Sequence, residues 1–281
     1  LMGYNMYMLY LEDTYEIPEY KYFGHMRGRY TKAEIKELDE YAKKFGIELV
    51  PAIQTLAHLN CIFKWPDFQT IRDIDDIVLV GSEDTYKLIN AMIKSISEMF
   101  STKRINIGMD EAFSLGRGKY FDINGKQSKK EIMIRHLNRV LDICKNYGMQ
   151  PMMWSDMFTR SEEGCIEFLP DEISNNVALI HWDYVTTNTE HLENALRIHK
   201  KLAKKVLFAG GAWKWEGYSP YLRFSYIASQ KALEAINNCG IDEIIVTSWA
   251  DGGGEASLFC VLPVYQMYAE ACYRGDVSEE H

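Results

Sequence analysis

The feature that most constrains the fold is a regular alternation of short apolar runs with longer segments of helical periodicity. The short runs have the composition of strands, at Tyr4–Leu11, Ile47–Ile53, Ile105–Gly108, Pro151–Trp154, Val177–His181, Val206–Ala209 and Ile244–Ser248. The segments between them repeat apolar residues at helical spacing, at Thr31–Phe45, Asp84–Phe100, Ser128–Tyr147, Thr189–Lys204, Pro220–Asn238 and Ala256–Tyr273. Strands separated by helices predict a parallel sheet that is covered by helices.

Local signals mark several helix ends. Thr31 followed by Glu34 has the pattern of a capping box, which predicts that a helix begins there. Gly148 and Gly240 follow two helical segments, at the position where a left-handed residue is favoured. The segment from Asp156 to Asn176 has only a weak helical pattern, so we expect an irregular crossover there.

This order of elements predicts an α/β fold, a (β/α)8 TIM-type barrel. Such a barrel needs eight strands and seven are visible, so the first strand and helix are predicted to lie before Leu1. The sequence contains no recognisable linker, repeat or low-complexity stretch. Residues 1–281 are therefore predicted to form a single barrel domain that is incomplete at its N-terminus.

Composition argues against several classes of partner. Apolar residues make up 47% of the chain and charged residues 25%, as in soluble globular proteins, and no apolar stretch approaches the roughly 20 residues that span a membrane. A net charge of −9 argues against nucleic acid, because phosphate binding needs clustered Lys and Arg. The six cysteines have no zinc-site spacing, which favours reduced thiols and a cytoplasmic protein.

Adjacent carboxylates end one of the predicted buried strands. Asp110 and Glu111 lie in RINIGMDEAF (Arg104–Phe113), and burying uncompensated charge there would cost several kcal/mol. A site that needs one proton donor and one fixed negative charge accounts for the pair. For this decapeptide alone, a solvated acidic turn is an equally good interpretation.

Other polar and aromatic residues follow the remaining strands, at the end where barrel enzymes place their chemistry. They are Glu12, Asp13, His58, Trp154, Asp156, Trp182, Tyr184, Trp213, Trp215, Trp249 and Asp251. Five of the six tryptophans belong to this set, which predicts an aromatic-walled pocket. The CH-rich face of a pyranose ring stacks on indole, and Asp156 or Asp251 would accept hydrogen bonds from its hydroxyls. The pattern therefore favours a carbohydrate ligand.

Two other ligands remain as alternatives. A metal would use the set His58, Glu12, Asp13 and Asp110, although the chain has no HExxH helix. A phosphate would lie at the glycines 252–254 before a helix, where the flanking acids Asp251 and Glu255 disfavour it. Five other histidines are interpreted as structural or surface residues, at His25, His136, His181, His191 and His199.

Taken together, the chain resembles glycoside hydrolase family 20, the β-N-acetylhexosaminidases. The resemblance covers nearly all of it: RGRYTKAEIKELDEYAKKFGIELVPAI (Arg27–Ile53) with the following His58, IGMDEA (Ile107–Ala112), the successive tryptophans, and the closing Trp249-Ala250-Asp251. It implies an exo-acting hydrolase that removes terminal β-linked N-acetylglucosamine or N-acetylgalactosamine, with a glycan substrate and with no cofactor or metal.

The resemblance also implies a mechanism and roles. The substrate's own acetamide oxygen would attack the anomeric carbon, an exception to the two-carboxylate scheme of sugar hydrolysis. Glu111 would be the acid and base, Asp110 would orient the acetamide, and His58 with Glu12 (or Asp13) would tune Glu111. Trp154, Trp182 and Trp249 would wall the pocket, and Asp251 would bind the outer hydroxyls.

The chain departs from the family pattern at three places. The second barrel strand ends in LEDTYEIPEY (Leu11–Tyr20), where an Asp-Asp pattern is commoner, so Glu12 and Asp13 remain alternatives for one role. The family's sugar-binding arginine belongs to the first barrel strand, which this sequence lacks. GGAWKWEG (Gly210–Gly217) stands where a Tyr-x-Asp pattern is usual, so Tyr184, Trp213 and Trp215 are the candidate donors to the acetamide oxygen. A conventional retaining glycosidase with Glu216 or Glu255 as nucleophile, and a non-catalytic carbohydrate-binding barrel, are the alternative functions.

Overall fold

A computed structural model describes residues 2–160, 165–251 and 254–275. The chain divides into two compact units. The larger unit consists of Asn5–Ala178, and the smaller unit consists of Leu1–Tyr4 together with Leu179–His281. The single-domain assignment stays a prediction.

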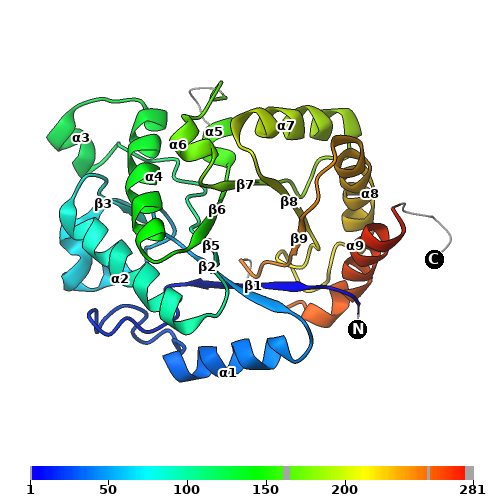
Figure 1. The fold of residues 1–281 in the computed structure, drawn as a ribbon, viewed down its shortest axis with the longest axis horizontal. Coiled ribbons are helices and arrows are strands. Elements are labelled where there is room, and N and C mark those ends of the chain that lie inside the picture. The colour runs from blue at the N-terminus through cyan, green and yellow to red at the C-terminus, as the bar shows by residue number, and fades with distance from the viewer. Residues whose placement is uncertain (1, 161–164, 252–253, 276–281) are drawn as a thin grey trace. The chain divides into compact units, whose positions relative to one another are not determined.

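The larger unit is built on four parallel strands. In sheet order they are β1 (Met6–Glu12), β2 (Glu48–Ile53), β5 (Arg104–Asn106) and β6 (Gln150–Trp154). Three long helices connect them, α1 (Lys32–Lys43), α2 (Glu83–Met99) and α4 (Lys129–Asn146). Helix α1 packs on β2 and α2, and α2 packs on α4, so the helices form one layer beside the strands (Figure 1).

Short elements fill the crossovers of the larger unit. After β2 come the 3-10 helices η1 (Ile62–Lys64) and η2 (Pro66–Ile71) and the antiparallel pair β3 (Arg72–Ile74) and β4 (Ile77–Val78), none of which was predicted. Helix α3 (Lys119–Asn124) follows β5. Helices α5 (Asp156–Thr159) and α6 (Asp171–Ser174) follow β6, and their shortness confirms the irregular crossover predicted there.

The predicted helix caps are present. The Thr31 Oγ1 accepts the Glu34 N–H at 3.2 Å, and the Glu34 carboxylate accepts the Thr31 N–H at 2.8 Å, which completes the capping box of α1. Gly240 ends α8 (Leu222–Cys239) in the left-handed conformation.

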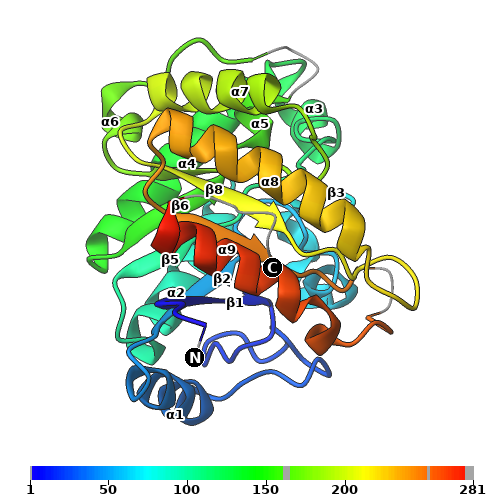
Figure 2. The ribbon, with the colours of Figure 1, turned by 90° about the vertical axis from the view of Figure 1, so that its right-hand side faces the viewer.

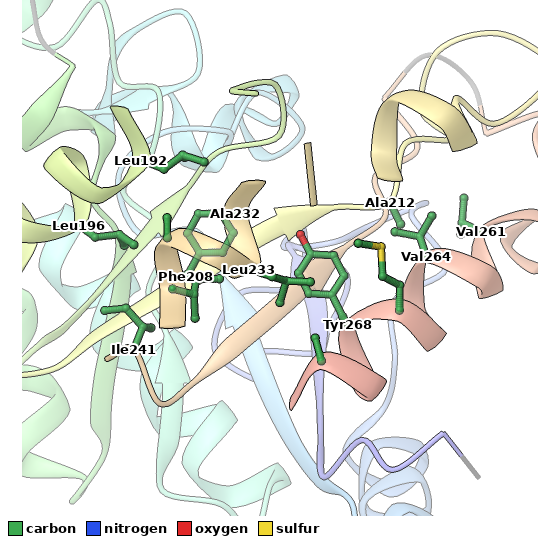
Figure 3. Close-up of a cluster of buried hydrophobic side chains, with 14 residues drawn as sticks. Leu192, Leu196, Phe208, Ala212, Ala232, Leu233, Ile241, Val261, Val264 and Tyr268 are labelled. Atoms are coloured by element: carbon green, nitrogen blue, oxygen red, sulfur yellow. The ribbon is translucent and has the colours of Figure 1, made fainter. Parts of the chain in front are cut away.

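The smaller unit contains three parallel strands in the order β7 (Ala178–Trp182), β8 (Val206–Gly211) and β9 (Ile244–Thr247). Its other elements are α7 (Thr189–Leu202), α8, the 3-10 helix η3 (Leu258–Val261) and α9 (Leu262–Arg274). Helix α8 packs against both α7 and α9 (Figure 2). Figure 3 shows the core between these helices and β8, in which Phe208 and Tyr268 are the largest buried side chains.

Gly3 and Tyr4 belong to the smaller unit because they pack on α9. The Tyr4 hydroxyl donates to the Tyr265 carbonyl at 2.7 Å, and the Tyr273 hydroxyl donates to the Gly3 carbonyl at 3.1 Å. The Tyr4 and Tyr265 rings meet edge to face. The N-terminal segment of this sequence is therefore fixed to its last helix.

The seven predicted strands are all present, with ends displaced by one or two residues. The alternation of parallel strands with helical crossovers confirms the predicted α/β class. The last helix was predicted to begin at Ala256, but it begins at Leu262, where Pro263 suits a first turn because it needs no N–H partner there. Among the helices of the described residues, none combines the length and apolarity needed to cross a bilayer.

Candidate active site

The carboxyl ends of β1, β2 and β5 bring several predicted site residues to one edge of the larger unit. Glu12 ends β1 and lies opposite Ile53, the last residue of β2. Gln54 and His58 follow β2, and Asp110 and Glu111 follow β5. Parallel neighbouring strands present these ends on the same side of the sheet, the side where barrel chemistry is found.

Asp110 and Glu111 both reach the same imidazole. The His58 Nε2 lies 3.3 Å from Asp110 Oδ2 and 3.6 Å from Glu111 Oε2. Consecutive side chains of an extended strand point to opposite faces, so a regular strand would separate them. Glu111 is instead in the left-handed conformation, with a φ of 53°. The structure thus brings together three of the residues predicted to be catalytic.

Non-glycine residues with positive φ concentrate at this edge. Three predicted site residues are among them, each at a cost of about 1–2 kcal/mol relative to ordinary backbone. Within the described ranges the full set is Glu12, Met26, His58, Asp75, Met109 and Glu111. Strain of this kind is characteristic of functional sites, where the surrounding structure holds it in place.

Hydrogen bonding makes His58 a cation at neutral pH. The bond to Asp110 is the main reason that the His58 pKa rises to about 9, and the charges of Asp76 and Glu111 add to it against partial burial. Asp76 Oδ2 also accepts the backbone N–H of His58 at 2.8 Å and lies 3.8 Å from the Nδ1 of its ring. Sequence reasoning missed Asp76, which lies in the turn between β3 and β4.

Asp110 is held by a donor on each oxygen. His58 approaches Oδ2, and the Gln54 Nε2 donates to Oδ1 at 3.0 Å. Gln54 is completely buried, and its Nε2 also lies 3.3 Å from the Tyr10 hydroxyl. Gly108 makes room for this amide, because a Cβ at that position would lie 2.0 Å from Gln54 Oε1.

Two predicted site residues at the end of β6 and just after it, Trp154 and Asp156, are buried. Asp156 is buried, and its Oδ2 accepts the Glu111 N–H at 2.9 Å. It therefore fixes the backbone of Glu111, and its role as an acceptor for sugar hydroxyls stays a prediction. Trp154, predicted as a pocket wall, is only 3% exposed.

Glu12 and Asp13 form a cluster with Arg27. The Arg27 guanidinium lies 3.4 Å from Glu12 Oε1 and 3.2 Å from Asp13 Oδ1, and it donates to Cys61 Sγ at 2.9 Å. Burial raises the pKa of Asp13, and the charge of Arg27 opposes that rise. The relay from Glu12 or Asp13 to His58 stays a prediction. In the described part of the chain, no three His, Cys, Asp or Glu side chains have the geometry of a metal site.

Five predicted aromatic residues form one cluster in the smaller unit, centred on Tyr184. Its ring stacks on Trp182 at 5.2 Å and meets Trp215 edge to face at 5.5 Å. Trp213 stacks on Trp215 at 4.3 Å and donates its Nε1–H to the Tyr184 carbonyl at 2.8 Å. The Trp249 Nε1–H is donated to the Tyr184 hydroxyl at 3.1 Å. The loops after β7, β8 and β9 are thus joined through one tyrosine.

Gly211 of β8 lies against two rings of this cluster. A Cβ at Gly211 would lie 2.8 Å from the Trp215 ring and 3.0 Å from Tyr184, so only glycine admits the two rings. Asp251, Glu216 and Glu255 are exposed. Residues 252 and 253, which belong to the phosphate alternative, lie outside the described residues.

Comparison with known proteins gives one family and several similar folds. The sequence profile described as "Glycosyl hydrolase family 20, catalytic domain" matches residues 11–203. Hexosaminidase D of Bos taurus is 25% identical over 230 residues, which cover 76% of this chain and 62% of that protein. This chain therefore spans about three fifths of the length of that relative.

Solved structures share the fold, among them the following two. The exo-β-N-acetylglucosaminidase of Vibrio harveyi, in complex with N-acetylglucosamine, has a TM-score of 0.70 at 16% identity, over 99% of this chain and 50% of that one. The β-N-acetylhexosaminidase of Bacteroides fragilis has a TM-score of 0.70 at 18% identity, over 96% of this chain and 60% of that one. These likenesses confirm the (β/α)8 TIM-type fold class that the sequence predicts.

Proposed function

The chain belongs to glycosyl hydrolase family 20, and we propose that it is an exo-acting β-N-acetylhexosaminidase. Its substrate would be a glycan or glycoside with a terminal, non-reducing, β-linked N-acetylglucosamine or N-acetylgalactosamine. One observation carries the proposal: Asp110 and Glu111, adjacent in sequence, both reach the Nε2 of His58. Two acids on one side of a substrate suit a reaction in which the substrate supplies its own nucleophile.

The first step of the proposed reaction forms an oxazolinium ion. The acetamide oxygen bonds to the anomeric carbon while the glycosidic bond breaks, and Glu111 gives its proton to the leaving oxygen. Asp110 accepts the acetamide N–H and stabilises the positive charge that develops on the nitrogen. The donors on its two oxygens, from His58 and Gln54, hold the carboxylate in one position for this role.

The second step returns the enzyme to its starting state. Glu111 takes a proton from a water molecule whose oxygen bonds to the anomeric carbon, and the bond from that carbon to the acetamide oxygen breaks. Each of the two displacements inverts the configuration at the anomeric carbon, so the overall reaction retains it. Exposure of 42% of the Glu111 side chain is compatible with exchange of its proton with water.

We also propose that the Tyr184 cluster supplies apolar surface for sugar binding. Its members Trp182, Tyr184, Trp213 and Trp249 are half-buried, and their rings are held by stacking and hydrogen bonds. Fixed aromatic faces bind the CH-rich side of a pyranose with little loss of side-chain freedom. Asp251 is proposed to accept hydrogen bonds from the outer hydroxyls.

The deciding experiment compares two aryl glycosides that differ only at the 2-position. The chain should hydrolyse an aryl 2-acetamido-β-glucoside and leave the 2-hydroxy analogue essentially uncleaved. Equal rates on both would contradict participation of the acetamide. Trapping of Glu216 or Glu255 by a 2-fluoro sugar would indicate the conventional retaining mechanism, and saturable binding without turnover would indicate a carbohydrate-binding barrel.

A further inference from the structure

His136 of α4 is a completely buried histidine with a partner on each ring nitrogen. Its Nε2 lies 2.9 Å from the Thr55 carbonyl oxygen, and its Nδ1 lies 3.2 Å from the Tyr86 hydroxyl. A carbonyl only accepts, so Nε2 carries the proton and Nδ1 accepts from the tyrosine. Burial lowers the pKa of His136 to about 4, so the ring is neutral near neutral pH.

The Thr55 carbonyl belongs to the segment that carries two contacts of the acid pair. Gln54, one residue before it, donates to Asp110, and His58, three residues after it, lies against Asp110 and Glu111. The Thr55 hydroxyl donates to the Ile107 carbonyl of the chain that leads to Asp110, at 2.8 Å. His136 is thus bonded to the backbone between the two residues that hold Asp110.

The outer side of His136 is fixed as well. Tyr86 belongs to α2, and the Arg139 guanidinium lies 4.0 Å from its ring centroid. Arg139 makes two hydrogen bonds of 3.1 Å to the Glu83 carboxylate. A charged pair on the surface of α2 and α4 therefore holds the tyrosine that sets the orientation of the buried imidazole.

We propose that His136 is a positioning residue for the reaction, which holds the Thr55 carbonyl from α4 and thereby keeps Gln54 and His58 in register with Asp110. The predicted fall in kcat rests on the proposed function, whereas the predicted shift of the Gln54–His58 segment rests on the contacts alone. Without the Nε2–H, the Thr55 carbonyl is a buried acceptor with no partner, and the segment must shift to reach another donor. A shift of about 1 Å at a catalytic group lowers rates by up to about 100-fold.

Two amide substitutions form the matched test. His136→Gln places an N–H donor near the position of Nε2, so it should retain the bond to Thr55 and keep kcat within about threefold of wild type. His136→Asn reaches only the position of Nδ1, so it should lose that bond and lower kcat about 10- to 100-fold, with a smaller change in KM. Equal kcat values for wild type and a folded His136→Asn variant would overturn the proposal.

A measurement without substrate separates this inference from the proposed function. In His136→Asn the NMR-measured pKa of His58 should fall from about 9 toward its ordinary value, while His136→Gln should preserve it. An unchanged His58 pKa in a folded His136→Asn variant contradicts the inference even if the wild type hydrolyses no hexosaminide. Should that variant fail to fold, nitrogen NMR of the wild type decides: a proton on Nδ1, or a doubly protonated ring at pH 7, overturns it.

Discussion

Asp110 and Glu111 are neighbours in sequence with different surroundings. The Asp110 side chain is 17% exposed and has a donor at each oxygen, whereas the Glu111 side chain is 42% exposed and its backbone N–H is donated to Asp156. Two carboxylates in unlike environments take unlike roles in catalysis. The immobilised acid suits a fixed negative charge, and the more accessible acid suits proton transfer.

Replacing Glu111 with Gln tests this division of roles. The variant should lose about 10²- to 10⁴-fold in kcat on substrates with poor leaving groups, because a positioned acid contributes that much. The loss should be smaller for an activated aryl leaving group, which departs without a proton. Glu131→Gln, at an exposed position of α4, is the control and should leave kcat unchanged. A uniform, mild effect of Glu111→Gln would assign the proton to another group.

Gly108→Ala tests the close approach of Gln54 to the chain before Asp110. The added Cβ would overlap Gln54 Oε1, so we expect a loss of stability of about 2–4 kcal/mol and reduced hydrolysis. Gly46→Ala is a matched control, because Gly46 has a φ of 69° against 74° at Gly108 but nothing within 4 Å of the new Cβ. The control should cost only about 1 kcal/mol. Equal losses in urea unfolding would show that conformation alone matters.

Two partners of the acid pair and His58 were given no role by sequence reasoning, because they lack a recognisable local signal. Gln54 is uncharged, and its importance comes from the 3.0 Å contact with Asp110 across two strands. Asp76 lies beside Asp75 in a tight turn, where paired acids are ordinarily solvated. The proximity of the acid pair and His58 was predictable, because each follows a predicted strand at the same end of a parallel sheet. Their partners depended on the tertiary structure.

At the scale of elements, hydrophobic periodicity predicted the parallel strands and the long helices, and it failed where elements are short. Strands β3 and β4 have three and two residues, too few for an alternating pattern to be visible. The apolar residues between Ala256 and Val261 also fit a helix, but the chain forms a 3-10 turn there and the helix begins beside Pro263. The short elements depend on contacts that no local window contains.

Tyr184 joins three loops, and its replacement should affect all of them. Tyr184→Ala removes the ring that contacts Trp182 and Trp215 and the hydroxyl that accepts from Trp249. We expect a marked change in the near-ultraviolet circular dichroism of the tryptophans and a rise in KM of about tenfold, from lost sugar stacking. Tyr184→Phe keeps the ring and should preserve most of both signals. Identical spectra for wild type and Tyr184→Ala would contradict the clustering.

At the scale of the whole molecule, the raised pKa of His58 couples stability to pH. The folded-state pKa of about 9 exceeds the ordinary 6.5. Protonation of His58 therefore stabilises the fold fully below pH 6.5 and progressively less from 6.5 to 9, and this stabilisation is lost above 9. The contribution is about 1–2 kcal/mol, discounted because nearly a third of the side chain is exposed. Urea unfolding from pH 6 to 10 should show this loss in wild type.

His58→Gln provides the control for the pH dependence. The variant lacks the titrating ring, so its stability should vary less with pH over the same interval, and the difference from wild type should narrow by pH 9.5. Parallel stability curves for the two proteins between pH 6 and 10 would mean that His58 does not gain its proton on folding.

Gly3 and Tyr4 contact α9, and Tyr4 is separated from its partner Tyr265 by 261 positions in the sequence. Bringing such distant segments together costs entropy that rises with the logarithm of the intervening length, so the contact is favourable only once both partners have formed. We therefore expect the contact between Tyr4 and α9 to form late in folding, after α9 itself has formed. The Tyr4 side chain is thus a natural spectroscopic probe of whether this contact has formed.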